Sequence, residues 1–133
     1  MTLDGKGTIS LWRAPARPDG TAPDIQVLVS EDDGAYAAHT NSVQAAHNLV
    51  AEFGVNHSGL RQSPVTTVSV NGLTFARAAW SGQGQRTGKT YEGIVYVLVA
   101  PSKYIEIQTH DAAPESRTTL PLLGASALSF RRL

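Results

Sequence analysis

The sequence contains no cysteine among its 133 residues. This absence excludes disulfides, thiol catalysis and thiolate metal ligands, although it does not indicate a cellular compartment. Neither charge is in excess, since 11 basic residues face 11 acidic ones. Because proteins that bind nucleic acid mainly through its phosphates carry a basic excess, we expect no nucleic-acid partner.

A long hydrophobic run is also missing, and we therefore expect no transmembrane segment. The first twelve residues lack the basic and apolar regions of a signal peptide. Two locations remain open: the cytoplasm, or the envelope or exterior if the sequence is a mature domain without its signal. With 41% hydrophobic and 17% charged residues, the composition is that of a folded protein, and the length predicts one domain over residues 1–133.

The first third of the chain predicts a hairpin and a helix. Thr8–Trp12 and Ile25–Ser30 are rich in β-branched and aromatic residues, and a proline-rich loop separates them. Ser42–Phe53 follows, with Asn41 or Ser42 as its cap and apolar residues at helical spacing. We interpret Asn56–Ser63, which comes next, as a polar connection.

The central stretch, residues 65–109, predicts four consecutive antiparallel strands. They are Val65–Val70, Leu73–Trp80, Tyr91–Ala100 and Tyr104–Thr109. Asn71-Gly72 is typical of a two-residue hairpin turn, which places Val70 opposite Leu73. Residues 94–99 are apolar on both sides of their strand, so both faces of the sheet should be covered.

The last predicted helix runs from Glu115 to about Ala127. Pro121 and Gly124 lie within it, and we expect them to bend or divide it. Together these elements predict an α+β fold with an antiparallel sheet of about six strands.

Three segments carry a likeness to a known family: VNGLTFARAAWSG (70–82), YEGIVYVLVAPSKYIEIQT (91–109) and the closing Leu128-Ser129-Phe130. They resemble the PsbP-like superfamily, and within it the bacterial branch that includes LpqN- and DcrB-type envelope proteins. The resemblance extends from about Ile25 to Phe130. It implies an α/β/α sandwich with helices on both faces of the sheet, and a non-catalytic accessory role. It supplies no catalytic residue to carry over.

One motif suggests nucleotide chemistry. Gly88-Lys89-Thr90 matches the end of a phosphate-binding loop, but the position of its first glycine is Gln83. Such a loop also leads into a helix, whereas this one leads into a predicted strand. We interpret residues 82–90 as a hairpin loop and expect no nucleotide or other cofactor.

The polar residues indicate neither a metal site nor an enzyme. No pair among His39, His47, His57 and His110 has the spacing of a helical zinc site. His110 could form a triad with Ser58 and Asp111 on paper, but nothing like a nucleophile elbow surrounds any serine. We predict no catalytic residue.

Two functional hypotheses remain. The first is a non-enzymatic protein-binding or assembly-accessory module, because cations beside aromatics are common in recognition surfaces. Its contact residues would be Arg77, Trp80, Arg86, Lys89 and Tyr91, unless Trp80 and Tyr91 pack under helices and the cations are merely solvated. The second is a small hydrophobic ligand in a pocket between sheet and helix, lined by Phe75, Trp80 and Tyr96. The sequence predicts no oligomeric state.

Overall fold

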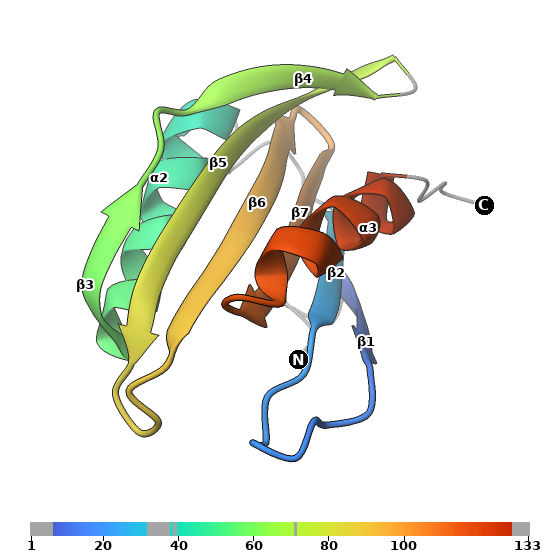
Figure 1. Cartoon of the computed structure of the whole chain (residues 1–133). Coiled ribbons are helices and arrows are strands. Elements are labelled where there is room, and N and C mark those ends of the chain that lie inside the picture. The colour runs from blue at the N-terminus through green and yellow to red at the C-terminus, as the bar shows by residue number, and fades with distance from the viewer. Residues whose placement is uncertain (1–6, 32–37, 39, 71, 129–133) are drawn as a thin grey trace.

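One antiparallel sheet of seven strands forms the centre of the molecule (Figure 1). The computed structural model describes residues 7–31, 38, 40–70 and 72–128. Its elements are β1 (Gly7–Arg13), β2 (Asp24–Glu31), α2 (Ser42–Glu52), the 3-10 turn η1 (Phe53–Val55), β3 (His57–Gln62), β4 (Thr66–Val70), β5 (Leu73–Gly84), β6 (Thr90–Ala100), β7 (Lys103–Ala112) and α3 (Ser116–Leu128). The strand order is β1-β2-β7-β6-β5-β3, and β4 also pairs with β5.

The predicted hairpins are confirmed. β1 pairs antiparallel with β2, and the four strands β4 to β7 pair consecutively. Val70 lies opposite Leu73, as the turn predicted. Gly72 has φ +79°, which L-residues adopt with strain; its neighbour Asn71 lies outside the described residues.

The predicted connection at 56–63 is wrong, because the structure has strand β3 there. β3 pairs with the end of β5, with His57 opposite Gly84 and Gln62 opposite Trp80. The register shifts between Ser58 and Arg61, so β3 is irregular. An exposed edge strand needs no apolar face, and the alternation that reveals other strands is therefore absent here. This strand alone brings the count to seven instead of about six.

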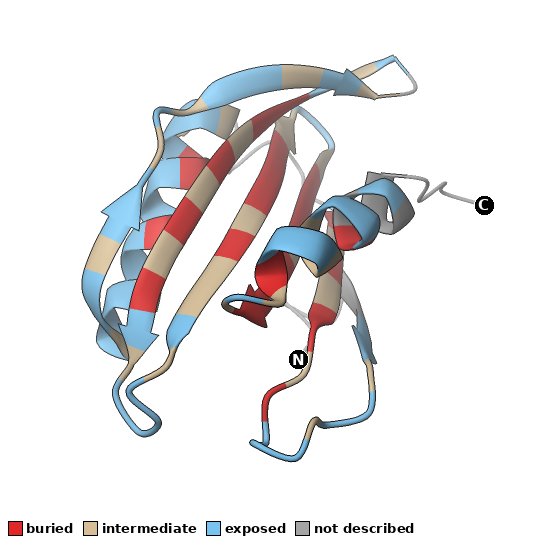
Figure 2. Cartoon of the chain, viewed as in Figure 1, coloured by how far each residue is buried: buried red, intermediate tan, exposed pale blue. Residues whose placement is uncertain are grey.

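Helix α2 covers one face of the sheet, over β5 and β6 (Figures 1 and 2). Asn41 caps it by accepting a 2.9 Å hydrogen bond from the amide of Gln44. The apolar residues packed on this face include Ala45, Ala46, Leu49, Val50, Ala76, Ala78, Trp80, Val95 and Val97. Val43, one of the apolar residues at helical spacing, is 41% exposed, whereas Ala45 is buried.

Helix α3 packs on the opposite face, against β7, β6 and β2. The buried residues of this face are Val27, Phe75, Tyr96, Leu98, Ile105 and Ile107. Pro121 lies inside α3, which continues from Ser116 to Leu128, so of the two expected effects, bending or division, division does not occur. The fold is thus α+β with one described helix on each face, and apolar β6 lies between the two layers.

Candidate ligand-binding groove

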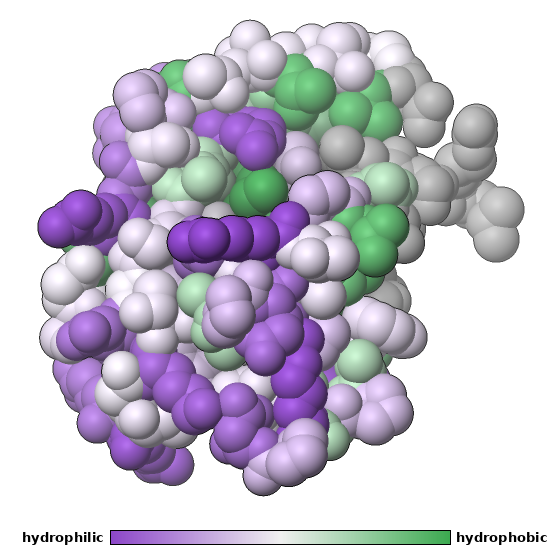
Figure 3. Space-filling view, viewed as in Figure 1, coloured by the Kyte–Doolittle hydropathy of each residue, from purple (hydrophilic) through white to green (hydrophobic). Residues whose placement is uncertain are grey.

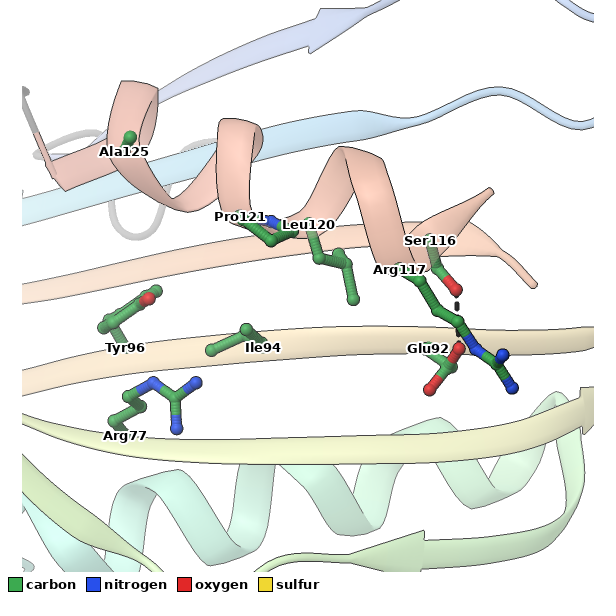
Figure 4. A pocket seen from close by; sticks show the side chains of 9 residues that line it. All are labelled: Arg77, Glu92, Ile94, Tyr96, Ser116, Arg117, Leu120, Pro121 and Ala125. Atoms are coloured by element: carbon green, nitrogen blue, oxygen red, sulfur yellow. Dashed lines mark hydrogen bonds between the residues drawn. The ribbon is translucent and has the colours of Figure 1, made fainter. Parts of the chain in front are cut away.

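A groove of about 440 Å³ lies between α3 and the strands β5 and β6 (Figure 4). It is lined by Arg77, Glu92, Ile94, Tyr96, Ser116, Arg117, Leu120, Pro121 and Ala125. Figure 3 shows an apolar area exposed between α3 and β5, with hydrophilic residues on either side of it. A volume of this size is within the usual range for small-molecule sites.

The groove exists because α3 is held toward one side of the sheet face that it covers, away from β5. At the start of the helix, Ser116 donates a 2.5 Å hydrogen bond to Glu92 of β6. One turn on, Thr119 donates a 2.6 Å hydrogen bond to Asp111 of β7. These bonds hold α3 beside β6 and β7, which leaves the β5 side of the same face uncovered.

Asp111 is the central anchor of this arrangement. Its carboxylate is fully buried and accepts two 2.7 Å hydrogen bonds from Arg17, in addition to the bond from Thr119. Burial raises the pKa of Asp111, but the hydrogen bonds from Arg17, Thr119 and the Ala112 amide outweigh it and the pKa falls below its ordinary value. Arg17 therefore holds the β1–β2 loop against β7, the strand that precedes α3 in the chain.

Two hydrogen-bond donors lie together at one end of the groove. Arg77 on β5 and Tyr96 on β6 are directly opposite each other in the strand register, and both lie at the same end of the groove (Figure 4). Within the described part of the chain, neither side chain has a hydrogen bond or ion pair. No fully buried side-chain N or O atom in the described residues lacks a hydrogen-bond partner, so the Tyr96 hydroxyl is not sealed from solvent, and Tyr96 is among the residues that line the groove.

The middle and far end of the groove have a different chemistry. Ile94, Leu120 and Pro121 supply apolar atoms between the ends. Glu92 and Arg117 occupy the end opposite Arg77 and carry opposite charges. The groove therefore combines one end with a cation and a neutral hydroxyl donor, an apolar centre and an opposite end without net charge.

The structure does not bring the five expected contact residues onto one surface. Trp80 and Tyr91 lie on the α2 face, where Trp80 stacks on Phe53 at 4.6 Å between ring centroids. Trp80 also lies against Gly93, where an added Cβ would stand 2.6 Å from the Thr109 carbonyl oxygen. This close approach explains a glycine in the middle of β6.

The cations of the set are separated as well. Arg77 faces the groove, while Arg86 and Lys89 belong to the β5–β6 loop. Lys89 forms a 2.8 Å ion pair with Asp19 of the β1–β2 loop. Hydrogen bonds from Lys89 and Thr21 lower the pKa of Asp19. Arg86 is exposed at the tip of the loop, and residues 85–89 lead into β6, as the hairpin interpretation required.

The expected pocket residues fall on two faces. Phe75 and Tyr96 belong to the cluster beneath α3, whereas Trp80 belongs to the cluster beneath α2. Of these three residues only Tyr96 lines the groove. Phe75 and Trp80 lie an odd number of residues apart on β5. Because successive side chains of a strand point to opposite faces, these two residues must face different sides of the sheet.

The described histidines do not line the groove. His57 and His110 flank Tyr91 on the α2 face, and His110 pairs with Asp24 at 2.6 Å. His110 and Asp111 are consecutive on β7 and point to opposite faces of the sheet, so the triad of Ser58, His110 and Asp111 does not form. The fourth histidine, His39, lies outside the described residues. Within the described ranges no group of three or more His, Asp or Glu side chains could hold a metal ion.

Known structures share this fold. No family model and no curated protein matches the chain in sequence. PA94 of Pseudomonas aeruginosa, a protein of unknown function, matches with a TM-score of 0.62 and 10% identity, over 95% of this chain and 83% of that one. LpqN of Mycobacterium tuberculosis, which is involved in cell envelope biogenesis, matches with a TM-score of 0.60 and 16% identity, over 93% and 82%.

The chain has an LpqN-like fold. At 10–16% identity the likeness extends to architecture and carries no residue roles. None of the helices in the described ranges has the length and apolar character needed to cross a membrane.

Proposed function

We propose that this chain is a non-enzymatic binding protein that holds a small amphipathic molecule in the groove beside α3. The observation that carries the proposal is the pair Arg77 and Tyr96, which present donors without partners next to an apolar surface. A partly buried cation facing apolar atoms is costly unless something compensates its charge. A bound molecule with both polar and apolar parts would satisfy both regions of the groove.

A thermal-shift screen followed by calorimetric titration tests this function. The screen uses lipids, fatty acids and aromatic metabolites, and hits are titrated against two variants. Ala125→Phe fills the groove, and Ala51→Phe places the same ring on the exposed side of α2 as a control. Binding should disappear in Ala125→Phe and persist in Ala51→Phe. A screen without hits, or equal binding by both variants, would contradict the proposal.

A protein-binding or assembly-accessory role is the second candidate. It is favoured by Arg86, an exposed cation at the tip of a hairpin loop without a partner among the described residues. Pull-downs with the wild type and Arg86→Ala, with Arg61→Ala on β3 as the matched exposed control, test it. Loss of a captured protein only in Arg86→Ala supports this role, and unchanged capture removes the loop from consideration.

The LpqN-like fold suggests a cellular location for the protein, whichever of the two functions it has. If the chain shares more than architecture with LpqN, it acts in the cell envelope and belongs to the PsbP-like superfamily, as the sequence resemblance predicts. Fractionation of cells that express the natural gene with a C-terminal tag tests the location. Recovery in the cytoplasm alone would contradict an envelope role.

A further inference from the structure

We infer that the ligand is an amphipathic monocarboxylate, whose carboxylate lies between Arg77 and Tyr96 and whose apolar tail runs along Ile94, Leu120 and Pro121. This inference rests on the proposed function, because it assigns a chemical class to the molecule held in the same groove. It also assigns an orientation, which the groove's two unlike ends make testable.

The anionic end follows from charge. Arg77 is the only charged residue at its end of the groove lining, and it has no ion-pair partner among the described residues. The side chain lies in the sheet surface between Phe75 and Ala79, and Thr66 and Tyr96 are its partners on the adjacent strands. None of these neighbours carries a compensating negative charge, so the position attracts an anion.

The preference for a carboxylate follows from donor geometry. A guanidinium presents parallel N–H donors that match the two oxygens of a carboxylate. Tyr96, which is 4% exposed, adds a hydroxyl held in place by its buried ring. Three donors converging on two oxygens would satisfy an anion that has left water, which an apolar groove alone does not do.

The tail and the single charge follow from the rest of the groove. Tyr96 and Glu92 are four residues apart on β6, which separates the two ends by about 13 Å. The surface between them is apolar, and a linear hydrocarbon tail of that length would cover it. At the far end Glu92 and Arg117 offset each other's charge, so a second anionic group would gain little there.

Calorimetric titration of the full chain with four ligands of equal tail length tests the inference. The ligands are decanoate, decanol, decylamine and the dicarboxylate sebacate, below their aggregation concentrations. We expect decanoate to bind best and decylamine worst. Arg77→Met should weaken decanoate binding about tenfold to hundredfold, as expected for a lost charge-assisted hydrogen bond, and leave decanol unchanged.

Two further variants guard against a folding artefact. Tyr96→Phe keeps the ring and removes the hydroxyl, and should weaken decanoate binding about threefold to tenfold. Arg86→Met removes an exposed cation outside the groove and should not affect binding. Circular dichroism and thermal unfolding check that each variant is folded.

The outcomes separate the two levels of the proposal. Equal affinities for decanol and decanoate, with no effect of Arg77→Met, would overturn the carboxylate inference and leave the groove as a binding site. No binding of any of the four ligands would overturn both. Stronger binding of an acetylated apolar tripeptide than of decanoate, again lost in Arg77→Met, would assign the site to peptide carboxyl termini and overturn the small-molecule class.

Discussion

The two faces of the sheet are covered in different ways. On one face α2 lies over β5 and β6, and the cluster beneath it includes Ala46, Val50, Val95 and Val97, each fully buried. On the other face α3 lies over β6, β7 and β2 and leaves a groove beside β5. The same central strands thus support a closed layer and an open one.

A difference in anchoring explains the difference in packing. Four small or apolar side chains of α2 are buried against the sheet, namely Ala45, Ala46, Leu49 and Val50. By contrast, α3 is fixed near its first turn by the buried carboxylate Asp111 and by Glu92. Packing in one layer serves stability, and incomplete packing in the other leaves room for a ligand.

Removing the charge of Asp111 should have the largest effect on the open face. We expect Asp111→Asn to lower the free energy of unfolding at pH 7 by about 2–3 kcal/mol, because Arg17 loses a buried partner. The pKa of Asp111 is lowered in the folded state, so its stabilisation is present above the ordinary value of 3.8 and is lost as pH falls through the folded value. Urea unfolding from pH 2.5 to 7 measures both the loss at pH 7 and the pH dependence of stability. If Asp111→Asn lost stability at low pH to the same extent as the wild type, Asp111 would not be the group responsible.

Neighbouring residues of β6 allow a direct comparison of the faces. Val95 is fully buried beneath α2, whereas Ile94 is partly exposed in the groove. Val95→Ala should cost about 2 kcal/mol, roughly 1 kcal/mol for each carbon removed. Ile94→Ala removes one carbon more but should cost about half as much per carbon, since the groove already exposes part of the side chain. Equal cost per carbon in urea unfolding would mean that both faces are closed.

A substitution at Glu106 should have a smaller effect on stability and, unlike the preceding ones, should stabilise the fold at neutral pH. It lies on the α2 face of β7, and burial raises its pKa despite hydrogen bonds from Tyr104 and Gln108. Glu106 therefore contributes to the stability of the fold at pH values below its ordinary pKa of 4.5. This contribution is lost as the pH rises through the pKa that Glu106 has in the folded state. Glu106→Gln should raise the Tm at pH 7.5 and give less advantage at pH 4. The same Tm difference at both pH values would contradict this.

The smallest effect is expected where the two loops meet. Asp19 and Lys89 form an exposed ion pair, and such pairs contribute little to stability. Lys89→Ala should leave the Tm unchanged within error at physiological salt. A large loss of stability would mean that the loops form part of the packed structure.

The sequence predicted the architecture because the architecture rests on local patterns. The turn at Gly72, the helix cap at Asn41 and the apolar run in β6 each indicated the correct element, and the two-sided run indicated covered faces. Strand β3 was missed, since an exposed edge strand such as residues 57–62 has no apolar alternation. The extent to which a helix covers a sheet face has no local signal.

The candidate site was predicted only in part for the same reason. Tyr96 and Arg77 were each singled out, but in different hypotheses, and Trp80 was assigned to both. Strand parity could have separated Trp80 from Phe75. Glu92, Ser116 and Arg117 could not be found, since their positions depend on how α3 docks. That docking is set by tertiary hydrogen bonds between segments distant in sequence.

Methyl chemical shifts during a titration with decanoate test the central claim most directly. The claim is that the α3 face is open to a ligand and the α2 face is closed. It predicts saturable shifts for the methyl groups of Ile94 and Leu120, and none for Val95 and Val97 beneath α2 or for Leu49 of α2 itself. Shifts of equal size on both faces, or on the α2 face alone, would contradict it.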